Sequence, residues 1–207
     1  MKSFLLIIFS VISTAASAQW KIGIKAGPTL SNYKSKTPWK EVSNLGYTFG
    51  ATAFKQIDEH VGVNFGIEYI QKGYYHKVCN TIYDKLKANY IEVPIMLDYG
   101  FRIPALQNFK GHANLGIYTA YWLSGKYQTK GFDTQDESFD FKKNKANHFD
   151  FGPNAGFRIE YLLKSGNSLF LDCRYELGVI DLQKRINDNT KNVNRALVIG
   201  ISYVKSL

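Results

Sequence analysis

The alternation of apolar and polar residues over positions 147–163 is the clearest pattern in this chain. Read with a period of two, Phe149, Phe151, Phe157 and Ile159 fall on one face, and the residues between them are polar, charged or glycine. Successive side chains of a β-strand point to opposite faces, so the pattern predicts one long strand. Soluble strands usually contain about 5 to 6 residues, whereas a membrane-spanning β-strand contains roughly 9 to 11. The length therefore favours a strand that spans a membrane.

The same alternation recurs along the rest of the chain. Further strands are predicted at 20–27, 46–55, 61–71, 89–102, 110–123, 169–178 and 196–203. The polar connections between them alternate in length, with long ones predicted at 28–45, 72–88, 124–146 and 181–192. Long extracellular loops and short periplasmic turns are typical of up-and-down outer-membrane barrels. The pattern predicts an all-β fold, an eight-stranded antiparallel transmembrane β-barrel.

Aromatic residues support this interpretation independently of the strand pattern. If the first strand rises from the periplasm, two groups form near the two rims of the barrel. The periplasmic group is Trp20, Tyr99, Phe101, Tyr161 and Tyr203, and the outer group is Tyr47, Tyr69, Tyr121 and Phe149. Two belts of aromatic side chains are typical of proteins that cross a bilayer, because these rings favour the membrane interface.

The N-terminus predicts export. Lys2 precedes an apolar run over 4–12, and Ala16-Ser17-Ala18 is a small-x-small cleavage site. The run is too short for a spanning helix, which needs about 20 residues, so it is interpreted as a signal peptide. We expect residues 1–18 to be removed, residues 19–207 to form the barrel domain, and the protein to reside in the cell outer membrane.

Charged residues interrupt the polar face of the predicted strands. The inward charged set is Lys21, Lys25, Glu68, Glu92, Asp98, Arg158, Glu160, Asp172, Arg174 and Glu176. Both signs are present, so neighbouring strands can pair them. Side chains about fill the interior of an eight-stranded barrel. The set is therefore predicted to be a structural network rather than an ion or proton path.

The loops carry most of the positive charge. The four long polar segments have net charges of +2, +3, +1 and +1, compared with +9 for the whole chain. A cationic outer face favours contact with outer-membrane lipids and the phosphates of lipopolysaccharide, or with an acidic surface protein. Simple solvation of loop lysines explains the charge equally well, and nucleic-acid recognition motifs are absent. The predicted surface contacts are Tyr33, Trp39, Lys72, Lys77, Lys85 and Lys87.

Catalytic and metal-binding patterns are weak. His148 beside Asp150, with Ser138 and His76 in loops, is the strongest arrangement for catalysis, but scattered histidines produce such pairs by chance. His76, Cys79 and Asp84 lack the second ligand pair of a zinc site. We expect no enzyme activity, no cofactor and no metal site. Cys79 and Cys173 are predicted to be unpaired, since one lies in a loop and the other in mid-strand.

Four segments resemble the PorT-like family of outer-membrane β-barrel proteins of Gram-negative bacteria. They are YIEVPIMLDYGF (90–101), DFGPNAGFRIEY (150–161), RYELGVIDL (174–182) and NRALVIGISYV (194–204). The resemblance implies the same barrel and the same membrane. PorT itself is associated with protein secretion, so a role as an accessory of a secretion or surface-assembly system is an alternative function. The chain departs from such barrels at its end, because it continues from Tyr203 to Leu207.

A soluble, secreted barrel of the lipocalin type is the third alternative. Such a barrel holds its ligand in an apolar interior, whereas this sequence places its charges on one strand face and a continuous apolar set on the other. That distribution favours an apolar exterior and therefore a membrane.

Overall fold

The structure is a computed structural model, and it describes residues 20–34, 40–77, 82–104, 106–131, 135–142, 146–182 and 192–207. The predicted signal peptide, Trp39 and Cys79 lie outside these residues. Within the described ranges, no helix has the length and apolar character needed to cross a membrane.

Ten strands make up the described secondary structure. They are β1 (Trp20–Lys34), β2 (Lys40–Val42), β3 (Asn44–Gln56), β4 (Val61–Lys77), β5 (Tyr83–Arg102), β6 (Phe109–Lys130), β7 (Gln135–Ser138), β8 (Phe149–Leu162), β9 (Ser168–Leu177) and β10 (Val193–Ser206). All their pairings are antiparallel. The all-β prediction is confirmed.

Eight of these strands close into a ring. The order β4-β3-β1-β10-β9-β8-β6-β5 returns to β4 through a β4–β5 pairing, and the first and last strands of the chain pair as β1–β10. The start of β1 and the C-terminus meet at one end, where the Leu207 amide donates to the Trp20 carbonyl. Short turns join β3 to β4, β5 to β6 and β8 to β9 at this same end, which is therefore the periplasmic one. The eight-stranded barrel is confirmed.

The two faces of the ring differ as the alternation requires. Along β9 every second residue is buried, and β8 follows the same alternation except at Gly156 and its last two residues; the residues between them, including Phe157 and Leu171, are exposed. Such large apolar side chains cover the outside of the ring, while most of the buried charged side chains point inward. The aromatic residues expected at the rims face outward, with Tyr121 and Phe149 exposed at the outer end and Tyr99 and Tyr203 at the periplasmic end.

The predicted long loops are partly wrong. Residues 28–34, 72–77, 83–88 and 124–130 continue the strands, so that β5 has 20 residues and β6 has 22. Most outward residues of these extensions are polar, with Leu30 an exception, so the apolar alternation that predicts a strand ends before the strand does. The inward alternation continues, with Ile70 and Tyr74 buried on β4 and Leu86 and Ala88 buried on β5.

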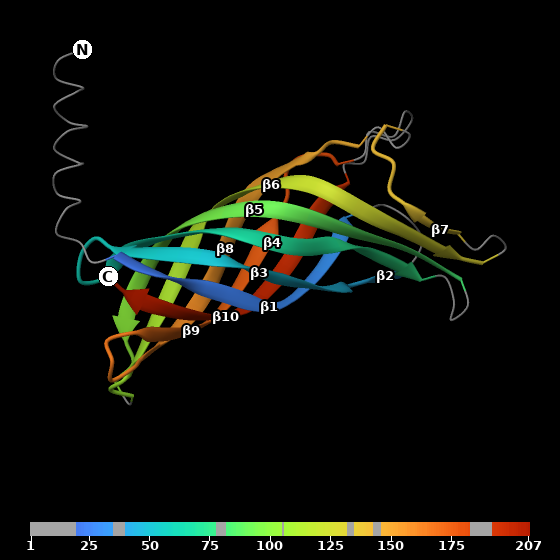
Figure 1. Cartoon of the computed structure of the whole chain (residues 1–207). Helices are drawn as coiled ribbons and strands as arrows, with labels where there is room; N and C mark the ends of the chain where they lie inside the picture. The colour runs from blue at the N-terminus through green and yellow to red at the C-terminus, as the bar shows by residue number, and fades with distance from the viewer. Residues whose placement is uncertain are drawn as a thin grey trace, which may run out of the picture.

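The extended strands build a sheet that rises above the ring. Figure 1 shows β4, β5 and β6 continuing beyond the other strands at the end opposite the C-terminus. β2 adds to the free edge of β4, and β7 adds to β6 through the pairs Lys126↔Ser138 to Thr129↔Gln135. Neither short strand was predicted from the alternation of residues. This raised sheet places side chains outside the membrane at fixed positions, which a flexible loop could not do.

Candidate functional site: a charged interior and an outward lysine face

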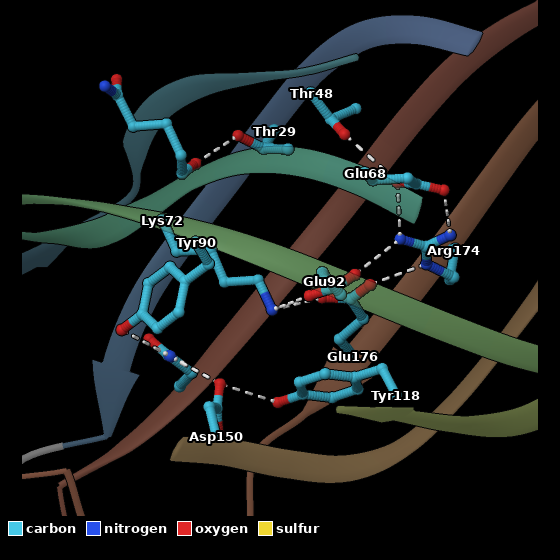
Figure 2. Close-up of polar contacts among 12 residues, drawn as sticks. Thr29, Thr48, Glu68, Lys72, Tyr90, Glu92, Tyr118, Asp150, Arg174 and Glu176 are labelled. Atoms are coloured by element: carbon cyan, nitrogen blue, oxygen red, sulfur yellow. Dashed lines mark hydrogen bonds and ion pairs between the residues drawn. The ribbon is translucent and has the colours of Figure 1, made fainter. Parts of the chain in front are cut away.

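Arg174 lies at the centre of the barrel interior. Its guanidinium, carried by β9, donates to Glu68 on β4 at 3.1 and 3.2 Å, to Glu92 on β5 at 2.9 Å and to Glu176 at 2.7 Å. All four side chains are almost completely buried. Figure 2 shows the three carboxylates converging on this one cation from different strands. A planar guanidinium with five donors suits such an arrangement, which a lysine could not reproduce.

Lys72 is part of the same cluster, which contradicts its prediction as a surface contact. Its ammonium lies 2.6 Å from Glu92 and 2.7 Å from Glu176, and the side chain is fully buried. It also lies 4.2 Å from the centre of the Tyr118 ring. The physical reason is register: on β4 the inward positions continue past Glu68 through Ile70 to residue 72. The prediction missed this continuation because it ended the strand at residue 71 and began the loop at residue 72.

Tyr33, the second misplaced surface contact, is also buried in the interior. Its hydroxyl lies 3.4 Å from that of Tyr90, and its ring packs 5.1 Å from the Tyr74 ring. β1 extends to Lys34, so residue 33 continues the inward set of that strand. Both corrections therefore have one cause, the underestimated length of the strands.

A second charged cluster fills the periplasmic half of the barrel. Asp98 accepts a bond from Arg158 at 2.9 Å and lies 2.6 Å from Nδ1 of His112. The other ring nitrogen of His112 lies 3.3 Å from Glu160, which also pairs with Lys21 at 2.8 Å. The aromatic ring of Phe170 lies 4.0 Å from the Arg158 guanidinium, a cation–π contact that the sequence pattern did not reveal.

Lys25 joins Asp172 to the Arg174 cluster, with its ammonium 3.3 Å from Glu68 and 2.6 Å from Asp172. All ten residues of the predicted inward set thus take part in salt bridges. The structure adds Lys72 and His112, and it adds Asp150, whose carboxylate accepts bonds from Tyr118 at 3.1 Å and Asn194 at 2.7 Å. The inward alternation alone could have identified these three residues.

Aromatic side chains fill the outer half of the interior. Trp122 stacks on Tyr90 at 5.6 Å and on Phe139 at 4.6 Å, and Phe141 meets it edge-on at 4.9 Å. Phe139 and Phe141 follow β7, so the segment after this strand folds back over the barrel mouth. Leu182 from the β9–β10 connection is also fully buried in this cluster. The described outer loops therefore cap the barrel instead of leaving it open.

The arrangement considered for catalysis is not assembled. Asp150 bonds to Tyr118 and Asn194 inside the barrel, while Nδ1 of His148 lies 2.9 Å from the Trp122 carbonyl and its ring stacks on Phe141. Within the described residues, no group of three or more His, Cys, Asp or Glu side chains is placed to hold a metal ion. Cys173 is a free, exposed thiol on the outer face of β9.

Lysines gather on the outward side of the raised sheet, and we call this group the outward lysine face. Antiparallel partners share a face, and Lys77 pairs with Tyr83, which pairs in turn with Lys130. Lys87 lies directly opposite Lys126 on the neighbouring strand. The outward lysine face consists of Lys77, Lys85, Lys87, Lys126 and Lys130. The structure thus brings together three of the predicted contacts, and it adds Lys126 and Lys130 from a segment predicted to be a loop.

The outward lysine face lies just above the membrane-facing part of the barrel. On β5, Lys87 is four residues beyond the outward Ile91, a height of about 10 Å for a tilted strand. A row of polar side chains separates the two levels: Gln71 donates to Asn89 at 3.0 Å, and Asn89 donates to Ser124 at 3.1 Å. In the direction away from the membrane, these strands therefore present apolar side chains first, then amide side chains and then lysines.

Among the residues that the structure describes, few anions compensate the outward lysine face. Burial and the neighbouring Lys87 ammonium lower the pKa of Lys85, whose ammonium lies 5.5 Å from the Tyr75 ring. Asp136 on β7 pairs with Lys126 at 3.0 Å, and this hydrogen bond lowers the pKa of the Asp136 carboxyl. The Asp136 pair is exposed, so it stabilises the sheet little. Like charges directly opposite each other destabilise a sheet, and the face therefore favours an external anion.

Comparison with known proteins agrees with this architecture. The family model described as "Outer membrane protein beta-barrel domain" matches residues 14–184. The outer membrane protein OprG from Pseudomonas aeruginosa is 12% identical with a TM-score of 0.53, covering 91% of this chain and 96% of that chain. A major outer membrane protein from Thermus thermophilus is 13% identical with a TM-score of 0.51, covering 92% of this chain and 100% of that chain. Both likenesses show the fold alone.

Ail, the attachment invasion locus protein of Yersinia pestis, is also similar, at 15% identity and a TM-score of 0.47 over 89% of this chain and 98% of that chain. No curated protein sequence matches this one. The soluble lipocalin-like alternative is wrong, because the family is one of outer-membrane barrels and the apolar side chains cover the outside of the ring.

Proposed function

Because the chain belongs to the outer membrane protein beta-barrel domain family, we propose that it is a non-enzymatic barrel that binds anionic groups at the cell surface. Its ligand is the phosphate-bearing part of lipopolysaccharide, and its binding surface is the outward lysine face. The charged interior serves to hold the barrel closed and rigid, so that the raised sheet keeps its position above the bilayer.

The observation that carries this proposal is the pairing of Lys87 with Lys126. Lys87 and Lys126 occupy directly opposite positions of an antiparallel pair, where like charges destabilise a sheet, and the exposed Asp136 pairs with Lys126 alone. A phosphate between them would convert this repulsion into two charge-assisted contacts. Their height of about 10 Å above the outward Ile91 corresponds to the headgroup region of the outer leaflet, where lipopolysaccharide carries its phosphates.

Removing the central pair tests the proposal. The variant Lys87→Gln/Lys126→Gln is expected to bind lipopolysaccharide roughly 30-fold more weakly, since each lysine near an anionic surface contributes about 1 kcal/mol. The measurement is binding of the purified barrel, held in uncharged nanodiscs, to lipopolysaccharide micelles. Affinity should also fall as salt is raised, because exposed charges are screened.

The matched control is Arg102→Gln/Lys164→Gln, which removes the same charge from the periplasmic end. Arg102 is exposed and makes only a 3.4 Å pair with Glu59, and Lys164 lies in the turn after β8. This control should bind lipopolysaccharide within about twofold of the unaltered protein. An equal loss in the two double variants would show that net charge alone, and not the outward lysine face, drives binding.

Export and processing belong to the same proposal. Residues 1–18 would direct the chain through the inner membrane and be removed, leaving Gln19 as the first residue of the barrel domain. The apolar run over 4–12 and the Ala16-Ser17-Ala18 site support this. Intact mass of the protein from outer membranes would distinguish a chain that begins at Gln19 from an uncleaved precursor.

A second candidate role is that of an accessory component in a PorT-like secretion or surface-assembly system. The resemblance of residues 90–101 and 150–161 to that family favours it. In that case the partner would contact the periplasmic turns. Cross-linking in intact cells followed by purification under denaturing conditions would capture secretion proteins under this hypothesis and none under the lipopolysaccharide hypothesis alone.

A further inference from the structure

The outer face of the barrel carries a groove centred on three strands, β1, β3 and β4. Its floor is Ala51 and Ala53 on β3, the two small residues between larger neighbours. Ile22 and Ile24 of β1 form one wall, and Phe65 and Ile67 of β4 form the other. These residues are neighbours in register, since Ala53 pairs with both Ile22 and Phe65 and Ala51 pairs with both Ile24 and Ile67. The groove has a volume of ≈ 770 Å³, within the range of small-molecule sites.

Aromatic side chains limit the groove at both ends. At its outer end, the rings of Phe49 and Tyr69 stack at 5.2 Å across β3 and β4. At its periplasmic end, Trp20 meets the Phe65 ring edge-on at 5.7 Å. The stretch of β3 from Phe49 to residue 55 rises about 15 Å along the membrane normal in a tilted strand. One leaflet contributes about half of the roughly 30 Å hydrocarbon core, so a rise of about 15 Å is the length of one acyl chain.

Two lysines lie at the periplasmic end of the groove. Lys205 lines it from β10, where it pairs with Ile22, and the ammonium of Lys55 lies 5.1 Å from the Trp20 ring. The described residues that line the groove include no acidic side chain. A cationic end on an otherwise apolar groove is complementary to one class of molecule present at this depth, a phospholipid with its phosphate at the membrane interface.

We propose that this groove binds a glycerophospholipid of the periplasmic leaflet, with one acyl chain over Ala51 and Ala53 and the phosphate between Lys55 and Lys205. A second copy of the chain is a poorer occupant. In a dimer with its twofold axis along the membrane normal, Lys55 and Lys205 of both copies would lie at the same depth in the membrane. Their like charges would repel each other across the interface. The site is distinct from the outward lysine face, which lies at the opposite end of the barrel.

Native mass spectrometry of the full mature barrel tests the site. The delipidated protein is titrated with palmitoyl-oleoyl phosphatidylglycerol in a mild uncharged detergent, and the first bound lipid is counted. Ala53→Phe should raise the Kd of this lipid roughly tenfold by filling the groove, and Lys55→Gln/Lys205→Gln should raise it by a similar factor by removing the phosphate partners. The matched control Ala155→Phe places the same ring on the exposed outer face of β8 and should change the Kd by less than about twofold.

Three results would overturn the proposal. One is an unchanged Kd in both groove variants, and another is an equal loss in Ala155→Phe, which would indicate unspecific binding to the apolar exterior. The third is a dimer that dissociates in Ala53→Phe, because it would assign the groove to a second copy. A loss in Ala53→Phe with full binding in the lysine variant would contradict the phosphate contact. None of these results depends on lipopolysaccharide binding, so the two proposals fail separately.

Discussion

Arg174→Met is expected to lower the free energy of unfolding by at least about 3–5 kcal/mol. Among the described residues, the guanidinium is the only cation within 3.2 Å of Glu68. Glu92 and Glu176 each pair with two cations, this guanidinium and the Lys72 ammonium. Its removal leaves three carboxylates close together in the barrel interior with two cations, Lys72 and Lys25, and Lys25 also pairs with Asp172. Burying an unpaired charge costs far more than the intact pair contributes, so the loss should be severe.

Urea unfolding of the folded barrel in detergent, followed by the difference in gel mobility between unheated and boiled samples, measures this effect. Arg174→Lys should recover only part of the loss, because an ammonium cannot reach three carboxylates with the geometry of a guanidinium. The control Arg102→Met removes an exposed pair and should cost less than about 1 kcal/mol. If Arg174→Met were as stable as this control, the interior network would not hold the barrel together.

Trp122→Ala should cost about 3–5 kcal/mol and open the outer mouth of the barrel. The indole is fully buried, stacks on Tyr90 and Phe139, and donates its Nε1 hydrogen to the Ser124 carbonyl at 2.8 Å. Its loss leaves a cavity at the point where the segment after β7 packs onto the barrel. That segment should then leave the mouth, because Phe139 loses its 4.6 Å stack on the indole and Phe141 loses its 4.9 Å edge contact.

Limited proteolysis and urea unfolding together test this second prediction. In the unaltered protein, cleavage within 139–142 should be slow, and in Trp122→Ala it should be at least about tenfold faster, since local opening costs less when buried contacts are lost. Phe157→Ala is the control, because this ring is 69% exposed on the outer face of β8. Its removal leaves no cavity in the barrel interior, so the cleavage rate within 139–142 should not change. Equal cleavage rates in Trp122→Ala and the unaltered protein would contradict the capping role.

The barrel core could be predicted from the sequence because a bilayer imposes a strict rule on it. Wherever a strand faces lipid, as with Phe157 and Leu171, every second residue must be apolar, and the inward set follows from the same period. For this reason the ten inward charged residues were identified without any knowledge of contacts. Which carboxylate meets which cation depends on the register between distant strands, such as β4 and β9, and the pattern does not contain this information.

The raised sheet could not be predicted from the same rule. Above the membrane, the outward residues of a strand are free to be polar, and Tyr83, Lys85 and Lys87 therefore resemble a loop. The inward residues Leu86 and Ala88 were the remaining signal, and they alternate too briefly to stand out. The misplacement of Lys72 has this same origin. The outward lysine face emerged only when the register brought β5 and β6 together.

Amine-reactive footprinting of the lysines tests the central claim most directly. The barrel is labelled with acetic anhydride in nanodiscs of phospholipid alone and in nanodiscs that contain lipopolysaccharide, and modification of each lysine is followed by mass spectrometry. Lys87 and Lys126 should be modified several-fold more slowly when lipopolysaccharide is present, whereas Lys164 at the periplasmic end should react equally in both, and the buried Lys72 should stay unmodified in both. Equal rates at Lys87 and Lys126 in the two membranes would contradict binding at the outward lysine face.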